Sequence, residues 1–172
     1  MKPSSKQKLI KRLHDYWRLE GFNMVMIPAL MLYFTKLQIS LGTVIATVAA
    51  VMLLGIGTLY WRAKLHQLQG KGEAFEPTMA WIGKLQIPSV ILTIIGAVYC
   101  VLFWLKPELS KGRPDQIAIT VMAVLAVLEY INYYHRQLQY FDNKADLKRV
   151  FSGKGFQPSQ MRRDLDQIAR NK

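Results

Sequence analysis

Glu129 is the one charged residue in the otherwise apolar stretch of residues 117–134. A carboxylate is costly to bury among apolar residues, so this position is a candidate site for a proton, a cation or a general base. On a helix, Glu129 shares a face with Asn132, Tyr133 and Arg136, which makes Arg136 a candidate counter-ion. Three further candidate counter-ions are Arg18, Arg62 and Lys64. The alternative is a structural carboxylate that hydrogen-bonds a neighbouring helix.

The second group of residues that could do chemistry is formed by three histidines, His14, His66 and His135. With Asp15, Glu20 and Glu129 they include the side-chain types that bind metals or transfer protons. The spacing argues against such a cluster, because no HxxxH or HExxH pair occurs and His135 lies about 240° around a helix from Glu129. We therefore expect no metal site, with the three histidines as weak candidates, and no cofactor. If the chain is an enzyme, its candidate catalytic residues are Glu129, Tyr133 and His135.

The sequence contains four apolar blocks, and we expect the helices that they form to position these residues. A helix needs about 20 predominantly apolar residues to cross the hydrocarbon core of a bilayer. The blocks predict spans at residues 17–37, 40–61, 87–105 and 116–136. The first is the weakest, because its uncharged part is short and contains Pro28. It reaches spanning length only if Trp17 and Lys36 lie at the two interfaces.

The distribution of charge predicts the topology. The chain has 51% hydrophobic residues and a formal net charge of +12. If all four blocks cross, 19 of the 23 Lys and Arg residues lie on one side. Cytoplasmic loops carry such an excess, so we expect both termini to be cytoplasmic, in a bacterial plasma (inner) membrane. The predicted fold is all-α, a four-helix transmembrane bundle that occupies residues 21–135.

The cytoplasmic segments predict one amphipathic interfacial helix at each end of the chain. Residues 1–20 form a basic amphipathic helix, which Ser4 or Ser5 can cap. Residues 137–172 form a basic tail with a short amphipathic helix over residues 160–170, capped by Ser159. The residues expected to contact anionic lipid headgroups or a partner are Lys8, Lys11, Arg12, Trp17, Arg62 and Arg136.

Small residues predict close helix packing. Gly42, Ala46 and Ala50 recur every four residues in the second span, and Ser89 and Gly96 belong to a similar stripe in the third. Such stripes allow helix backbones to approach closely. We interpret them as packing within one chain rather than as a dimer interface.

The composition excludes two classes and leaves three functions open. A single cysteine, Cys100, excludes a disulfide scaffold, and the basic residues indicate membrane topology and lipid attraction, not nucleic-acid binding. We expect a non-catalytic accessory subunit or scaffold whose basic cytoplasmic face binds lipid, a protein partner or a second copy of the chain. One alternative is a membrane-embedded enzyme that uses Glu129 with interfacial His and Tyr residues. The other is a small proton- or cation-coupled transporter that uses Glu129.

Overall fold

The structure, a computed structural model, describes residues 5–138 and 157–170. Within them the chain is α-helical, with two short 3-10 turns, η1 (Gly72–Ala74) and η2 (Pro107–Leu109), and one isolated β-bridge. The prediction of an all-α protein is confirmed for these residues. The predicted cap at Ser4 and the tail segment 139–156 lie outside the described residues.

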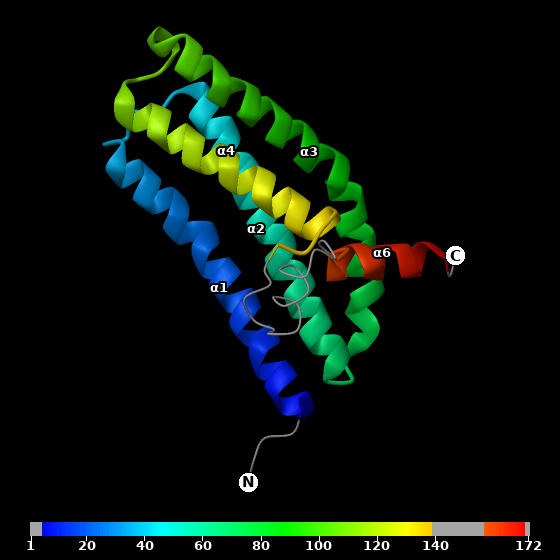
Figure 1. Ribbon diagram of the computed structural model, residues 1–172. Helices are drawn as coiled ribbons and strands as arrows, with labels where there is room; N and C mark the ends of the chain where they lie inside the picture. Colours follow the sequence, from blue (N-terminus) through cyan, green and yellow to red (C-terminus); the bar gives the residue numbers. More distant parts are fainter. Residues whose placement is uncertain (1–4, 139–156, 171–172) are drawn as a thin grey trace, which may run out of the picture.

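Four long helices lie side by side, and a short one crosses them (Figure 1). The long helices are α1 (Ser5–Phe34), α2 (Leu41–Leu68), α3 (Phe75–Leu105) and α4 (Arg113–Tyr134). Helix α2 packs against α1, α3 and α4, and the short helix α6 (Gln160–Arg170) packs on α3 and α4. We call the end of the molecule that carries α6 the basic end, and the opposite end, with the turns at 35–40 and 106–112, the far end.

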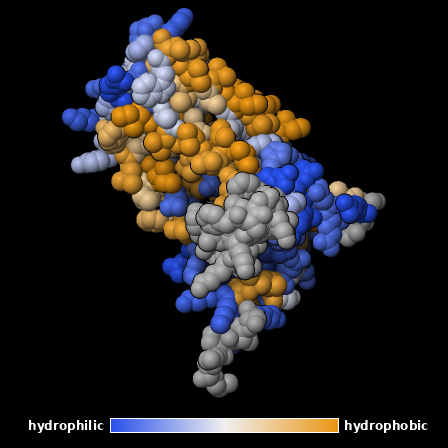
Figure 2. Space-filling model, viewed as in Figure 1, coloured by the Kyte–Doolittle hydropathy of each residue, from blue (hydrophilic) through white to orange (hydrophobic). Residues whose placement is uncertain are grey.

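Three helical segments are long and apolar enough to cross a membrane: Leu41–Leu68, Gly72–Leu105 and Arg113–Tyr134. The predicted first span at residues 17–37 is not among them, because the helix that contains it is strongly basic in its first half. On the face shown in Figure 2, apolar side chains form a broad band along the long helices, and hydrophilic ones lie around α6 and at the opposite end. This distribution is typical of a membrane protein, whose apolar surface faces lipid.

The helices are longer than the apolar blocks. The structure has no separate helix over residues 1–20, because α1 continues from Ser5 to Phe34 without a break. Between these ends the only helix-disfavouring residues are Gly21, which a helix interior tolerates at about 1 kcal/mol, and Pro28. Helix α2 likewise continues beyond the predicted span to Leu68, and α3 begins at Phe75, so polar turns of both helices extend into the basic end.

Small residues set the separation of the helices. A Cβ atom at Gly96 of α3 would lie 3.1 Å from Ala46 Cα of α2, and one at Gly42 would lie 2.9 Å from Tyr99. The two stripes expected from the sequence therefore pack on each other, within one chain.

At the far end, Asp115 joins the two turns. It is 1% exposed. Its Oδ1 atom accepts hydrogen bonds from the Ser40 N–H at 3.3 Å and the Thr43 hydroxyl at 2.5 Å, and Oδ2 accepts from the Lys111 N–H at 2.9 Å. The first turn is tight enough to place Lys36 and Leu37 in the left-handed region, with φ of 52° and 63°.

Candidate functional site

Glu129 lies on α4 about one turn before the helix ends, and its side chain is half-buried. The amide nitrogen of Asn132 donates to Glu129 Oε2 at 3.5 Å, and the Tyr133 hydroxyl interacts with the same carboxylate. Within the described residues, no ion pair to Glu129 is found. None of the four candidate counter-ions therefore pairs with it there, and Lys64 instead pairs with Asp164.

The carboxylate of Glu129 interacts with a second carboxylate, that of Glu20 on α1. Glu20 is 9% exposed, and its Oε1 atom accepts a hydrogen bond from the indole N–H of Trp61 at 2.8 Å. The hydroxyl of Tyr133 interacts with both carboxylates. Three helices thus supply the cluster: α1 gives Glu20, α2 gives Trp61, and α4 gives Glu129 and Tyr133.

Two polar atoms at the centre of this cluster are unsatisfied. Neither Glu20 Oε2 nor the Tyr133 hydroxyl completes a hydrogen bond of normal geometry with any described residue, although Tyr133 is only 2% exposed. The indole nitrogen of Trp17, three residues before Glu20 on α1, is also buried without a hydrogen-bond partner among the described residues. Buried polar groups are almost always paired, so such atoms mark a place where a proton, water or ligand completes the site.

Gly57 of α2 makes room for the cluster. A Cβ atom at this position would overlap Glu20 Oε2 and the Tyr133 hydroxyl. The two oxygens therefore lie directly against the backbone of α2, at a position where only glycine fits. The sequence analysis did not single out Gly57, because the contacts that require a glycine there come from Glu20 and Tyr133 on other helices.

The end of α4 is fastened to the segment that leads into α6. The Ser159 hydroxyl donates to the Tyr133 carbonyl, and its oxygen accepts from the Arg162 N–H at 3.0 Å. Ser159 thus caps α6, as the sequence predicts, and at the same time holds the backbone of Tyr133. The Tyr134 hydroxyl donates to the Ile82 carbonyl of α3 at 2.9 Å. These bonds fix the part of α4 that carries the cluster.

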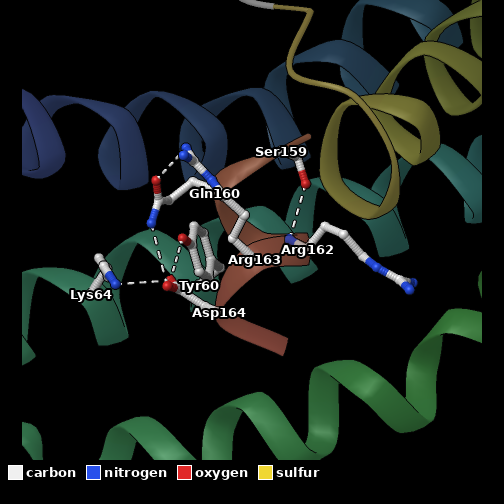
Figure 3. Close-up of polar contacts among 7 residues, drawn as sticks. All are labelled: Tyr60, Lys64, Ser159, Gln160, Arg162, Arg163 and Asp164. Atoms are coloured by element: carbon white, nitrogen blue, oxygen red, sulfur yellow. Dashed lines mark hydrogen bonds and ion pairs between the residues drawn. The ribbon is translucent and has the colours of Figure 1, made fainter. Parts of the chain in front are cut away.

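Asp164 attaches α6 to α2 (Figure 3). Its Oδ2 atom accepts hydrogen bonds from the Tyr60 hydroxyl and from Lys64 Nζ, both at 2.8 Å. The carboxylate is 8% exposed. The amide of Gln160 adds a longer bond to Oδ1 at 3.3 Å. The apolar face predicted for residues 160–170 therefore rests on the protein, with Met161 2% exposed.

A cavity of about 340 Å³ lies at the basic end, between α1, α2, the end of α4 and the start of α6. Cationic side chains from three helices line it, namely Arg12, Lys64 and Arg163. Apolar and aromatic side chains form the rest of the wall, among them Leu13, Tyr16, Tyr60 and Met161. Trp61, Asn132 and Tyr133 also line the cavity, so its inner end reaches the carboxylate cluster.

The predicted contact residues lie at the basic end, but few of them line this cavity. Lys8, Lys11, Arg12, Arg62 and Arg136 have exposed side chains, whereas Trp17 is half-buried. Of the six, Arg12 lines the cavity. The sequence analysis missed the roles of Lys64 and Arg163, because their position depends on how α6 docks on α2.

The structure does not bring the three histidines together. His14 lies 3.9 Å from Asp15, and the ring of His135 lies beside that of Tyr130, with centroids 5.4 Å apart. In the part of the chain that the structure describes, no three His, Cys, Asp or Glu residues are arranged to hold a metal ion. The candidate catalytic set is also divided, because Glu129 and Tyr133 interact with each other while His135 faces Tyr130.

Comparison with protein-family models, with curated proteins and with solved structures finds no match to this chain.

Proposed function

We propose that this protein is a non-catalytic accessory protein of the plasma membrane, a four-helix transmembrane bundle whose basic end faces the cytoplasm and binds anionic lipid headgroups. The fourth span in this proposal is α1. Its outward side chains are strongly exposed and apolar, with Val25 67%, Leu30 56% and Tyr33 85% exposed. Side chains of this kind favour lipid over water. With four spans, the positive-inside rule assigns both termini to the cytoplasm.

The cavity at the basic end is the observation that carries the proposal. It combines the cations Arg12, Lys64 and Arg163 with a wall of apolar side chains. A lipid phosphate matches the cations through charge-assisted hydrogen bonds, and the first carbons of its chains match the apolar wall. Asp164 neutralises part of the charge of Lys64, which leaves Arg12 and Arg163 as the main phosphate ligands.

Lipid retention in native mass spectrometry tests this proposal. The purified protein, in mild detergent, is exchanged against phosphatidylglycerol and, separately, phosphatidylcholine. We expect the anionic lipid to be retained preferentially. The double variant Arg12→Ala/Arg163→Ala should weaken its retention about a hundredfold or more, because each of the two lost charge-assisted bonds contributes about 1.5–3 kcal/mol.

The control variant is Lys106→Ala/Lys111→Ala, which removes two exposed cations from the far end. It should retain phosphatidylglycerol as the wild type does. An equal loss in both double variants would show general charge attraction, and an unchanged Arg12→Ala/Arg163→Ala protein would show that the cavity is not the lipid site. Either result overturns the proposal.

A further inference from the structure

A buried and a half-buried carboxylate on different helices meet around one hydroxyl group. Glu20 of α1 and Glu129 of α4 interact with each other and with the hydroxyl of Tyr133. Glu20 is 9% exposed and Tyr133 is 2% exposed. Among residues 5–138 and 157–170, no Lys, Arg or His forms an ion pair with either carboxylate. Like charges held this close in a medium of low dielectric constant cannot both stay ionised without a bound cation or proton.

Two unsatisfied oxygens lie together over Gly57. They are Glu20 Oε2 and the Tyr133 hydroxyl, two of the three buried side-chain atoms that complete no hydrogen bond among the described residues. The Tyr133 hydroxyl has one proton to donate and two carboxylates beside it, so a further proton on Oε2 would supply the donor that is missing. The missing hydrogen bonds and the repulsion between the two carboxylates are separate observations, and both indicate a proton beside Glu20 Oε2.

One hydrogen-bond donor points at each carboxylate, which disfavours a metal ion at these oxygens. The indole N–H of Trp61 points at Glu20 Oε1, and the amide N–H of Asn132 points at Glu129 Oε2. The Asn132 carbonyl oxygen already accepts from the Leu138 N–H at 2.9 Å. A metal ion needs a shell of free oxygen ligands, whereas donors at these positions would repel it.

The cavity provides the route by which a proton arrives. Trp61, Asn132 and Tyr133 line both the cavity and the cluster, so water in the cavity lies next to the carboxylates. The charged groups that face this water are Arg12 of α1, Lys64 of α2 and Arg163 of α6, and Lys64 is paired with Asp164. Among the described residues that line the cavity no other side chain is charged, and the remaining titratable ones besides Tyr133 are the hydroxyls of Tyr16 and Tyr60.

We propose that Glu20, Tyr133 and Glu129 form a proton-binding site in which the two carboxylates share one proton taken from water at the basic end. Binding of that proton reduces the charge of the pair from two negative charges to one. The site uses none of the cations that line the cavity, although it opens to the same cavity. It gives this small protein a group that can sense or transfer protons.

The fluorescence of Trp61 reports on the site, because its indole N–H touches Glu20 and not Glu129. The purified protein is titrated with acid and base around neutral pH, and the part of the signal that Trp61→Phe removes is assigned to this residue. We expect the wild type to show a pH-dependent change. We expect Glu129→Gln to abolish it as completely as Glu20→Gln does, because the shared proton needs both carboxylates.

The matched control is Glu76→Gln, an exposed acid in the first turn of α3, which should leave the change intact. A Glu129→Gln protein that keeps the wild-type response would overturn the proposal, since Glu20 would then titrate alone. Addition of Na⁺ at constant pH that reproduces the response would also overturn it, in favour of a metal-ion site.

Infrared spectroscopy of the wild type provides a test that does not depend on any variant folding. The difference spectrum between neutral and alkaline pH should contain the carbonyl stretch of a protonated carboxylic acid. The absence of this band would overturn the proposal.

Discussion

Asp115 at the far end and Glu20 at the basic end are both buried, and their carboxylates have opposite surroundings. At the far end, Asp115 accepts three hydrogen bonds, from the Ser40 and Lys111 backbones and from the Thr43 hydroxyl. At the basic end, Glu20 keeps one oxygen without a partner, next to a second carboxylate.

This difference separates a structural carboxylate from a functional one. The carboxylate of Asp115 already accepts hydrogen bonds from three donors of the protein. It therefore serves to hold the two turns together. The carboxylate of Glu20 has an oxygen without a donor and lies beside a second carboxylate. This arrangement lowers local stability, but it allows Glu20 to bind a proton or a ligand. The satisfied carboxylates of Asp115 and Asp164 join segments that are distant in the sequence, whereas the unsatisfied oxygen of Glu20 belongs to a cluster beside an open cavity.

The largest effect is expected from Asp115→Ala. The change removes the acceptor of three donors in a 1% exposed position, so we expect the free energy of unfolding to fall by about 3 kcal/mol. Chemical unfolding in mixed micelles measures this change. Glu108→Ala, at an exposed position of the same end, is the control and should shift stability by less than about 0.5 kcal/mol. Equal stability of the two variants would contradict a structural role for Asp115.

A smaller loss is expected from Asp164→Ala, which tests whether the basic end also has a structural carboxylate. Tyr60 and Lys64 would each lose a hydrogen bond at 2.8 Å, and α6 would lose its attachment to α2. We expect a loss of about 2 kcal/mol and faster cleavage of α6 by protease.

Asp166→Ala on the same helix is the matched control for this variant. Its ion pair with Arg162 is nearly half-exposed, so its removal should change stability by only a few tenths of a kcal/mol. Protease cleavage of α6 at the same rate in both variants would show that Asp164 does not hold the helix.

The sequence predicts the features that depend on local pattern. The apolar blocks identify α2, α3 and α4, because a stretch of that length without charge has few alternatives to a buried or membrane helix. Ser159 followed by the apolar spacing of residues 160–170 locates α6, because a cap and an amphipathic face are local signals. The apolar blocks do not predict where the long helices begin and end, because these helices continue into polar segments beyond the blocks.

The site itself depends on contacts between distant residues, which a single sequence does not encode in a visible way. The sequence marks Glu129 as unusual and includes Glu20 in a possible cluster, but it predicts a cation beside Glu129 where the structure has a second acid. Gly57 is indistinguishable from other small residues of its helix until α1 and α4 are in place. The partners of Asp115 lie 72 and 75 residues away, so its role is equally hidden.

An intermediate effect is expected from Gly57→Ala. A methyl group there overlaps Glu20 Oε2 and the Tyr133 hydroxyl, so the cluster must move and we expect a loss of about 1.5 kcal/mol. Gly55→Ala, two residues earlier on α2, is the matched control. Its methyl group would lie 3.5 Å from the Met24 sulfur, which is an ordinary contact, and the better helix propensity of alanine should stabilise the protein slightly. Losses of equal size in the two variants would show that the tight packing over Gly57 is not specific to the cluster.

The smallest effect is expected from Glu20→Gln, and its comparison with Asp115→Asn gives the sharpest contrast between the ends. Glu20→Gln removes a charge beside Glu129 and provides a donor for it, so the free energy of unfolding should stay unchanged or rise by up to about 1 kcal/mol. Asp115→Asn places an amide N–H against the donors of Ser40, Thr43 or Lys111, so stability should fall by about 1–2 kcal/mol. Both variants are compared with the wild type by chemical unfolding in the same micelles at neutral pH. Opposite signs are expected because one carboxylate has three donors to satisfy and the other has a like charge to accommodate. If Glu20→Gln destabilises the protein as much as Asp115→Asn does, Glu20 is a structural acceptor too, and the distinction between the two ends fails.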